Sequence, residues 1–211
     1  RKAQHPWQEI LTIFRNDVPH LVMHRMPKVI LVTITLFISC GIAGWLLVAN
    51  YPELASLFAS EEMINKVQRG ELWTDGLLNI VPSAVLSLSI MTNNIVVSFF
   101  AFVMGAFYGV GTLYIISLNG LMLGGIFAFT AQYGLAYRLF KFIIAHGIVE
   151  LSIICLAGAA GIQLGEALIR PGNKSRGEAF AEAVSQAGKL LFVAIPFLIG
   201  AGLIEGFVSP N

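Results

Sequence analysis

Long apolar stretches separated by short polar segments make up most of this chain, and their lengths predict its architecture. A transmembrane helix needs about 20 consecutive, mainly apolar residues to cross the hydrocarbon core of a bilayer. Five stretches qualify, and they cover residues 29–49, about 95–117, about 119–137, about 142–164 and about 189–208. The pattern therefore predicts an all-α fold, a polytopic transmembrane helical bundle of about five spans.

The segments between these stretches complete the predicted topology. The four residues 117–120 (SLNG) join the second and third spans, so we expect a tight antiparallel hairpin there. Residues 7–14 place apolar side chains three and four positions apart, which predicts an amphipathic helix on the membrane surface. Residues 77–91 are apolar but short and contain Pro82, so we interpret them as an interfacial or re-entrant segment before the second span.

The chain is thus predicted to have two parts. A cytoplasmic or interfacial amphipathic segment covers residues 1–28, and a transmembrane helical domain covers residues 29–211. The domain includes an extracytoplasmic loop at about residues 50–91.

Composition supports a membrane protein and excludes several other classes. Hydrophobic residues make up 56% of the 211 residues and charged residues only 12%, against about 25% charged residues in a soluble domain. The net charge of +1 gives no reason to expect nucleic-acid binding. Cys40 and Cys155 lie in separate apolar stretches without a CxxC motif or a Cys/His cluster. No disulfide framework, metal site or cofactor is predicted.

Basic residues near the ends of the spans predict the orientation of the chain. With five spans, the segment before the first span and the loop between the fourth and fifth spans lie on one side, and both are basic: Arg1, Lys2, Arg15, Arg25, Lys28, Arg170, Lys174, Arg176 and Lys189. The long loop on the opposite side also carries several acidic residues. We therefore expect a multi-pass membrane protein with a cytoplasmic N-terminus.

Five polar side chains interrupt the predicted spans, and five crossings would place all of them in the outer half of the membrane: Asn93, Asn94, His146, Glu150 and Glu205. A central charge in hydrocarbon costs roughly 2.5–3.5 kcal/mol on insertion scales, so the glutamates should face the bundle interior or a water-filled vestibule. His146 and Glu150 are four residues apart and share one helix face. We predict a polar intramembrane cluster that either binds an ion or a proton or forms a structural hydrogen-bond network. The simpler alternatives are side chains that reach the interface and, for the asparagines, a helix N-cap.

Glycine spacing predicts how the helices pack. Four GxxxG motifs occur in or beside the second to fifth spans, at Gly105–Gly109, Gly120–Gly124, Gly161–Gly165 and Gly202–Gly206. In lipid, small residues let helix backbones approach closely and so hold a bundle together. We expect these four spans to form one compact bundle. Whether the same faces also support a homo-oligomer such as a dimer is left open.

Four short motifs together resemble the stage II sporulation protein M family. They are the Asn pair at 93–94 that opens a glycine-rich span, LNGLMLGG at 118–125, HGIVELSIICLAGAAG at 146–161 and IEGF at 204–207. The resemblance covers about residues 90–208 and, more loosely, the first span. Many members have Pro before the histidine and after the glutamate of the third motif, where this chain has Ala145 and Leu151-Ser152.

The resemblance implies an integral protein of the bacterial or archaeal cell membrane, with about five spans and no known catalytic activity. In spore formers, the named member of the family is similar to a membrane scaffold that associates with peptidoglycan-degrading partners. The family also includes bacteria and archaea that never sporulate. The resemblance therefore implies an architecture more specifically than a biological role.

Three functions are compatible with these features. The first is a non-enzymatic scaffold or assembly protein in the lipid bilayer, with a membrane or extracytoplasmic protein partner that docks on residues 50–91. No GxSxG, HExxH or Walker motif is present, so no catalytic residue is predicted. The second is a channel or transporter with the polar cluster as an ion- or proton-binding vestibule. The third is a metal-dependent intramembrane enzyme that uses the histidine and the two glutamates.

Overall fold

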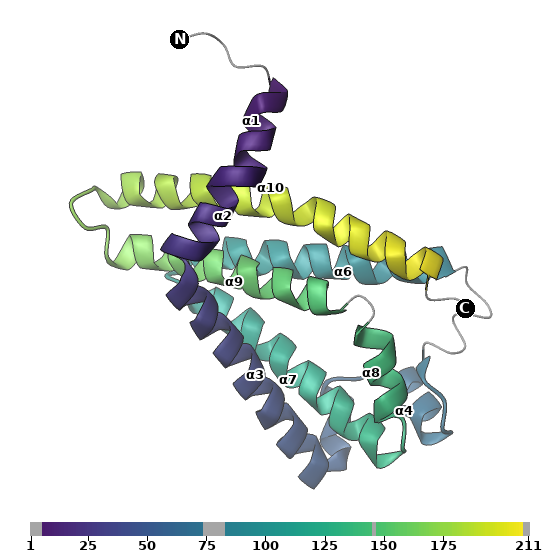
Figure 1. Cartoon of the computed structure of the whole chain (residues 1–211). Coiled ribbons are helices and arrows are strands. Elements are labelled where there is room, and N and C mark those ends of the chain that lie inside the picture. Colours follow the sequence, from purple (N-terminus) through teal and green to yellow (C-terminus); the bar gives the residue numbers. More distant parts are fainter. Residues whose placement is uncertain (1–5, 74–82, 145–146, 209–211) are drawn as a thin grey trace.

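The computed structural model describes residues 6–73, 83–144 and 147–208, and within these it describes side chains except at residues 6, 83–88, 90 and 201–208. The described residues form helices and turns, with no strand among them (Figure 1). The long helices are α3 (Pro27–Asn50), α6 (Ser83–Val103), α7 (Val110–Gln132), α9 (Gly147–Ile169) and α10 (Arg176–Val208). The short ones are α1 (Pro6–Thr12), α2 (Val18–His20), α4 (Glu61–Gln68) and α8 (Ala136–Ile144), with short π-helical segments at η1 (Ile13–Asp17) and η2 (Leu21–Arg25) and 3-10 segments at η3 (Pro52–Leu57) and η4 (Met104–Ala106).

The long helices form a bundle with alternating directions, as the predicted topology requires. Helix α7 packs along α3, while α6, α9 and α10 pack against one another (Figure 1). Helix α9 is central, because most of its residues are buried, whereas most of α3 is exposed. Helices α3, α7 and α10 run toward one end of the bundle, and α6 and α9 run back (Figure 1). The predicted all-α helical bundle is confirmed.

The predicted hairpin at residues 117–120 is wrong, because α7 runs through them without a break. The Asn119 side chain forms a hydrogen bond within the helix, donating from Nδ2 to the Ile115 carbonyl oxygen at 2.8 Å. Gly120 lies where α7 approaches α3, and a Cβ there would overlap the Phe37 carbonyl oxygen. This glycine therefore permits a helix contact, and it does not mark a turn.

The chain reverses instead between α6 and α7, at residues 104–109. Tyr108 has φ 54° and Gly109 has φ 80°, both in the left-handed region. The Thr112 hydroxyl donates to the Ala101 carbonyl oxygen at 2.6 Å and so ties the first turn of α7 to the last turn of α6. This reversal shifts the boundaries of the second and third spans upstream of the predicted ones.

The segment that we predicted to be interfacial or re-entrant also has different boundaries. Residues 83–91 are the first part of α6, and residues 77–82 lie outside the described residues. The third predicted span likewise divides, because α7 ends at Gln132 and the separate helix α8 follows Gly134, whose φ is 74°.

Residues 51–73, which we call the cap, fold over one end of α3 and α7. The cap contains η3 and α4, and Ser60 caps α4 by accepting a hydrogen bond from the Met63 backbone N–H at 3.3 Å. Apolar residues of the cap share one buried cluster with α3, α7, α8 and the connection between the last two: Val48, Ala55, Val67, Leu72, Ala128, Phe129, Leu135 and Leu139. Much of the predicted loop is therefore folded and packed against the bundle.

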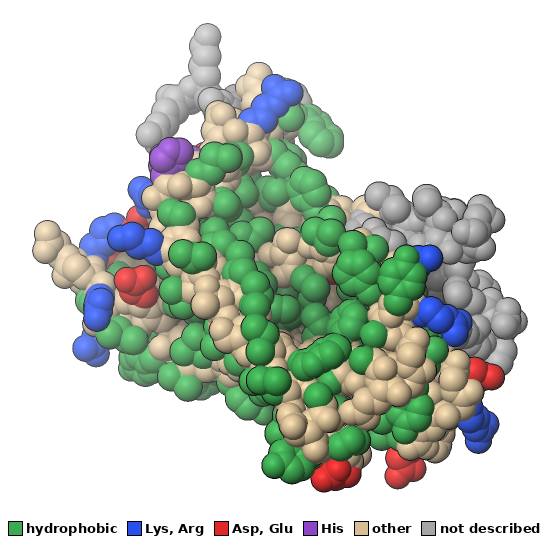
Figure 2. Space-filling model, turned by 60° about the horizontal axis from the view of Figure 1, so that its bottom comes forward, with side chains coloured by type: hydrophobic (Ala, Val, Ile, Leu, Met, Phe, Trp, Pro, Cys, Tyr) green, Lys and Arg blue, Asp and Glu red, His purple; other side chains and the backbone are tan. Residues whose placement is uncertain are grey.

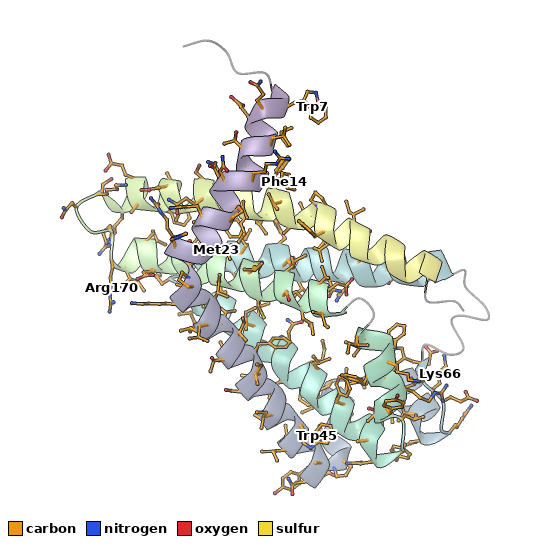
Figure 3. The ribbon with its side chains drawn as sticks, in the orientation of Figure 1. Trp7, Phe14, Met23, Trp45, Lys66 and Arg170 are labelled. Atoms are coloured by element: carbon orange, nitrogen blue, oxygen red, sulfur yellow. The ribbon has the colours of Figure 1, made fainter. Side chains whose placement is uncertain are left out.

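The N-terminal segment, residues 6–26, crosses α10 near the start of α3 (Figure 1). It packs there through buried Val18 and Leu21, which join one cluster with residues of α10. Phe14 meets Phe192 edge to face with ring centroids 6.3 Å apart, and it lies over α10 in Figure 3. The predicted helical N-terminal segment thus also makes tertiary contacts with the bundle.

Candidate functional site: a carboxylate–amide pair between α6 and α9

Glu150 is a buried carboxylate between α6 and α9, near the beginning of α9. Only 3% of the surface of this residue is exposed to solvent, and it lies in the first turn of α9. The Asn94 side chain on α6 donates from Nδ2 to Glu150 Oε2 at 2.5 Å. The positive end of the α9 helix dipole also favours a carboxylate in this turn. These two contributions offset part of the cost of placing the group inside the bundle.

Apolar side chains surround the pair on two sides. Ile95 and Ile153, the neighbours of Asn94 and Glu150 on the two helices, pack with Leu198 of α10. On the other side, Leu151 and Ile154 belong to the cluster between α9, α6, α3 and α7. The pair therefore lies in a low-dielectric environment, where a hydrogen bond between an amide and a carboxylate is stronger than in water.

Small residues bring α6 and α9 close enough for this bond. A Cβ on Gly105 would overlap the Gly161 carbonyl, and a Cβ on Gly161 would overlap the Ala101 carbonyl oxygen. In the next turn, a Cβ on Gly165 would overlap the Gly109 backbone. The two backbones thus touch along a line of small residues that continues from the Asn94–Glu150 pair toward the α6–α7 reversal.

A second contact of the same kind joins α7 to α3. A Cβ on Gly124 would overlap the Gly41 carbonyl, and a Cβ on Gly44 would overlap the Leu121 backbone. Of the eight glycines in the predicted motifs, Gly105, Gly109, Gly120, Gly124, Gly161 and Gly165 lie at such contacts. Gly202 and Gly206 lie in α10 beyond its described side chains.

The structure places the members of the predicted polar cluster differently. It brings together Asn94 and Glu150, while Asn93 is exposed on α6. His146 lies outside the described residues, and Glu205 lies in the last turns of α10, where side chains are not described. The end of α10 lies beside the beginnings of α6 and α9, as five crossings require (Figure 1).

Sequence reasoning missed one buried polar residue on the same helix as Asn94. Ser98 follows Asn94 by one helical turn and is 3% exposed, and its hydroxyl has no hydrogen-bond partner within the described part of the chain. The i, i+4 spacing from Asn94 was a signal that could have identified it. Thr112 lies elsewhere, at the α6–α7 reversal, and its bond to Ala101 was not predicted because the apolar pattern did not predict that reversal.

Metal chemistry has no support in the described residues, where no three His, Cys, Asp or Glu side chains gather at one place. The predicted third function would need His146 and the Glu205 side chain, both outside the description. The geometry that can be described is a carboxylate held by an amide.

Helix length and family together identify the class of protein. Four described helices are long and apolar enough to cross a membrane, namely α3, α7, α9 and residues 176–200 of α10. The family model described as Stage II sporulation protein M matches residues 33–210. The chain belongs to this family. No curated protein and no solved structure matches the chain.

Family membership extends the sequence resemblance to most of the chain. The match includes nearly all of the first span and the cap as well as the four motif regions. As a stage II sporulation protein M family member with several apolar helices, the chain is a multi-pass membrane protein.

Proposed function

We propose that this family member is a non-enzymatic integral membrane scaffold that organises cell-envelope or peptidoglycan-remodelling partners. In this proposal the N-terminus is cytoplasmic, and the cap faces the opposite side of the cell membrane. The basic residues near the start of α3 and between α9 and α10 support this orientation.

The cap is the observation that carries the proposal. Its buried residues fix it to the bundle, so its outer surface is presented in a defined position. That surface exposes four carboxylates, at Glu53, Glu61, Glu62 and Glu71, against the basic residues Lys66 and Arg69. Figure 2 shows acidic side chains at the edge of the molecule that carries the cap. A folded, charged surface outside the lipid is suited to a protein partner with a basic face.

In a scaffold, the Asn94–Glu150 pair has a structural role. It fixes the register of α6 against α9, because a slip of either helix would leave a buried carboxylate without its amide donor.

Charge reversal on the cap tests the proposal. The double variant Glu53→Lys/Glu71→Lys changes exposed cap residues, and Glu9→Lys/Glu166→Lys makes the same change at exposed positions outside the cap. Each full-length variant would be purified from native membranes in mild detergent, and co-purifying proteins quantified. We expect the cap variant to lose partners that the control retains. Equal recovery with both variants would contradict docking on the cap.

A channel or transporter is the second candidate, and the buried carboxylate of Glu150 is the observation that favours it. Against it, α6 and α9 touch backbone to backbone at Ala101 and Gly161, so the two helices are closely packed there. Proton or cation flux into proteoliposomes distinguishes the candidates. A transporter should show flux that Glu150→Gln abolishes, whereas a scaffold should match empty liposomes.

A further inference from the structure

The N-terminal segment and α10 line an open pocket at the end of the bundle opposite the cap. Its volume is about 640 Å³, within the range of sites that hold small ligands. Residues 15–25 form one wall, and Gln186 and Lys189 of α10 form the other. The contacts of Phe14, Val18 and Leu21 with α10 hold the walls together.

An unusual backbone shapes the wall formed by the N-terminal segment. Two π-helical segments, η1 and η2, flank Pro19, and η2 ends with the Met26 N–H bonded to the Leu21 carbonyl oxygen at 2.9 Å. π-Helical turns are rare and occur frequently at functional sites. Here they widen the helix where its polar side chains line the pocket.

Basic and imidazole side chains dominate the lining. Arg15, His20, His24, Arg25 and Lys189 all line the pocket. The two imidazoles stack with ring centroids 4.8 Å apart and planes at 18°. In Figure 2, histidine and basic side chains gather at the edge of the molecule away from the cap.

The acidic side chains nearby neutralise only part of this positive charge. Asp17 lines the pocket, but its Oδ2 is 2.5 Å from Lys189 Nζ and is thereby paired. Arg25 Nη1 is 3.8 Å from Glu182, which Lys174 binds more closely. Within the described part of the chain, Arg15 has neither an ion pair nor a hydrogen bond from its side chain. The Arg15 guanidinium therefore has donors available for a ligand, and the Arg25 guanidinium, which also lines the pocket, is only weakly paired.

Exposed apolar side chains of the same segment place the pocket at the level of lipid headgroups. Trp7, Leu11 and Met23 are 69%, 52% and 70% exposed, and Figure 3 shows Trp7 at the far end of the segment from the bundle. The apolar helix α3 begins at Pro27, directly after the pocket residues. Exposed Trp and Leu beside cationic side chains are typical of a helical segment at the membrane–water interface.

We propose that this pocket binds the phosphate group of an anionic phospholipid headgroup. Arginine donors match phosphate oxygens in pairs, and such charge-assisted hydrogen bonds are among the stronger ones in proteins. Basic pockets between membrane helices are known to hold anionic headgroups. A soluble phosphate ester has the same chemistry, but the neighbouring apolar side chains favour a ligand that carries acyl chains.

The test compares two arginines at the same end of the bundle. Arg15 lines the pocket, whereas exposed Arg176 at the start of α10 is not among its lining residues. Full-length wild type, Arg15→Gln and Arg176→Gln would be titrated in neutral detergent with phosphatidylglycerol, with phosphatidylcholine and with glycerol phosphate. Tryptophan fluorescence would report binding.

We expect wild type to bind phosphatidylglycerol and to show no saturable binding of the other two ligands. Arg15→Gln should weaken this binding about tenfold, which corresponds to about 1.4 kcal/mol for one lost charge-assisted contact. Arg176→Gln should change it less than about twofold, and Arg15→Lys should restore part of the affinity. All variants should unfold at the wild-type midpoint without lipid.

Three results would overturn the proposal. Equal weakening by Arg15→Gln and Arg176→Gln would mean general charge attraction. Glycerol phosphate that binds as tightly as the lipid would make a soluble phosphate ester the ligand. Absence of saturable binding of phosphatidylglycerol would remove the site. None of these results depends on cap partners, so the scaffold proposal is tested separately.

Discussion

Asn94 and Glu150 meet across the α6–α9 interface, with the amide nitrogen 2.5 Å from the carboxylate oxygen. They lie 56 residues apart in the chain, and the bond forms only when both helices have the correct register. This pair is therefore a direct test of how α6 packs against α9.

A double-mutant cycle should show coupling between these two residues. Asn94→Leu leaves the carboxylate without its amide donor, and Glu150→Met leaves the amide without its acceptor, so each should cost about 2–3 kcal/mol. The double variant should cost less than the sum, with a coupling of about 1.5–3 kcal/mol. The measurement is the free energy of unfolding in mixed micelles. Additive losses would show that the bond contributes nothing beyond the separate side chains.

Alanine at two glycines should have opposite effects on stability. At Gly161 the new Cβ overlaps the Ala101 carbonyl oxygen, so Gly161→Ala should destabilise the protein by about 1–3 kcal/mol. At Gly188, in the same bundle, no atom lies within 4 Å of the new Cβ. Gly188→Ala should stabilise its helix by roughly 0.5–1 kcal/mol. Thermal unfolding of both variants tests the contact at Gly161. Equal unfolding midpoints for Gly161→Ala and Gly188→Ala would refute it.

The effect of substitutions at Tyr108 on stability should depend on how well each residue tolerates a left-handed backbone. Its φ of 54° costs an L-residue roughly 1–2 kcal/mol, and the side chain is 58% exposed. Tyr108→Gly should therefore be neutral or stabilising, whereas the β-branched Tyr108→Val should lose about 1 kcal/mol or more. The order of the unfolding midpoints tests this, and a glycine variant less stable than the valine variant would contradict it.

The Asp17–Lys189 ion pair should hold the N-terminal segment on α10. Its two side chains are 35% and 43% exposed, so its contribution to global stability should be less than about 1 kcal/mol. Lys189→Asp should nevertheless accelerate amide hydrogen exchange in residues 13–26. The swapped variant Asp17→Lys/Lys189→Asp should restore much of the protection. Unchanged exchange in the single variant would show that apolar contacts alone hold the segment.

The apolar pattern predicted the membrane class and the bundle because span length follows directly from bilayer thickness. It misplaced the second and third spans because Asn and Gly are common in turns. Here Asn119 bonds within α7, and Gly120 lets α7 approach α3. The true reversal uses Tyr108, an aromatic residue whose left-handed backbone has no signal in the sequence.

The candidate site was predictable only in part. The side of the membrane and the cost of a buried carboxylate brought Asn94 and Glu150 together in the prediction. They could not distinguish Asn94 from Asn93, because the face that α6 turns to α9 depends on tertiary contacts such as that of Ala101 with Gly161. The core of the cap was missed for a related reason, since its few apolar residues, such as Val67, are buried only against other elements.

The most direct test of the scaffold is the set of proteins that accompany the wild-type chain from its native membrane. The chain would be purified in mild detergent without crosslinking, and the stoichiometry of each co-purifying protein measured. The proposed function predicts a cell-wall hydrolase or another extracytoplasmic protein at a fixed ratio to the chain. A chain that is recovered only with copies of itself would contradict it.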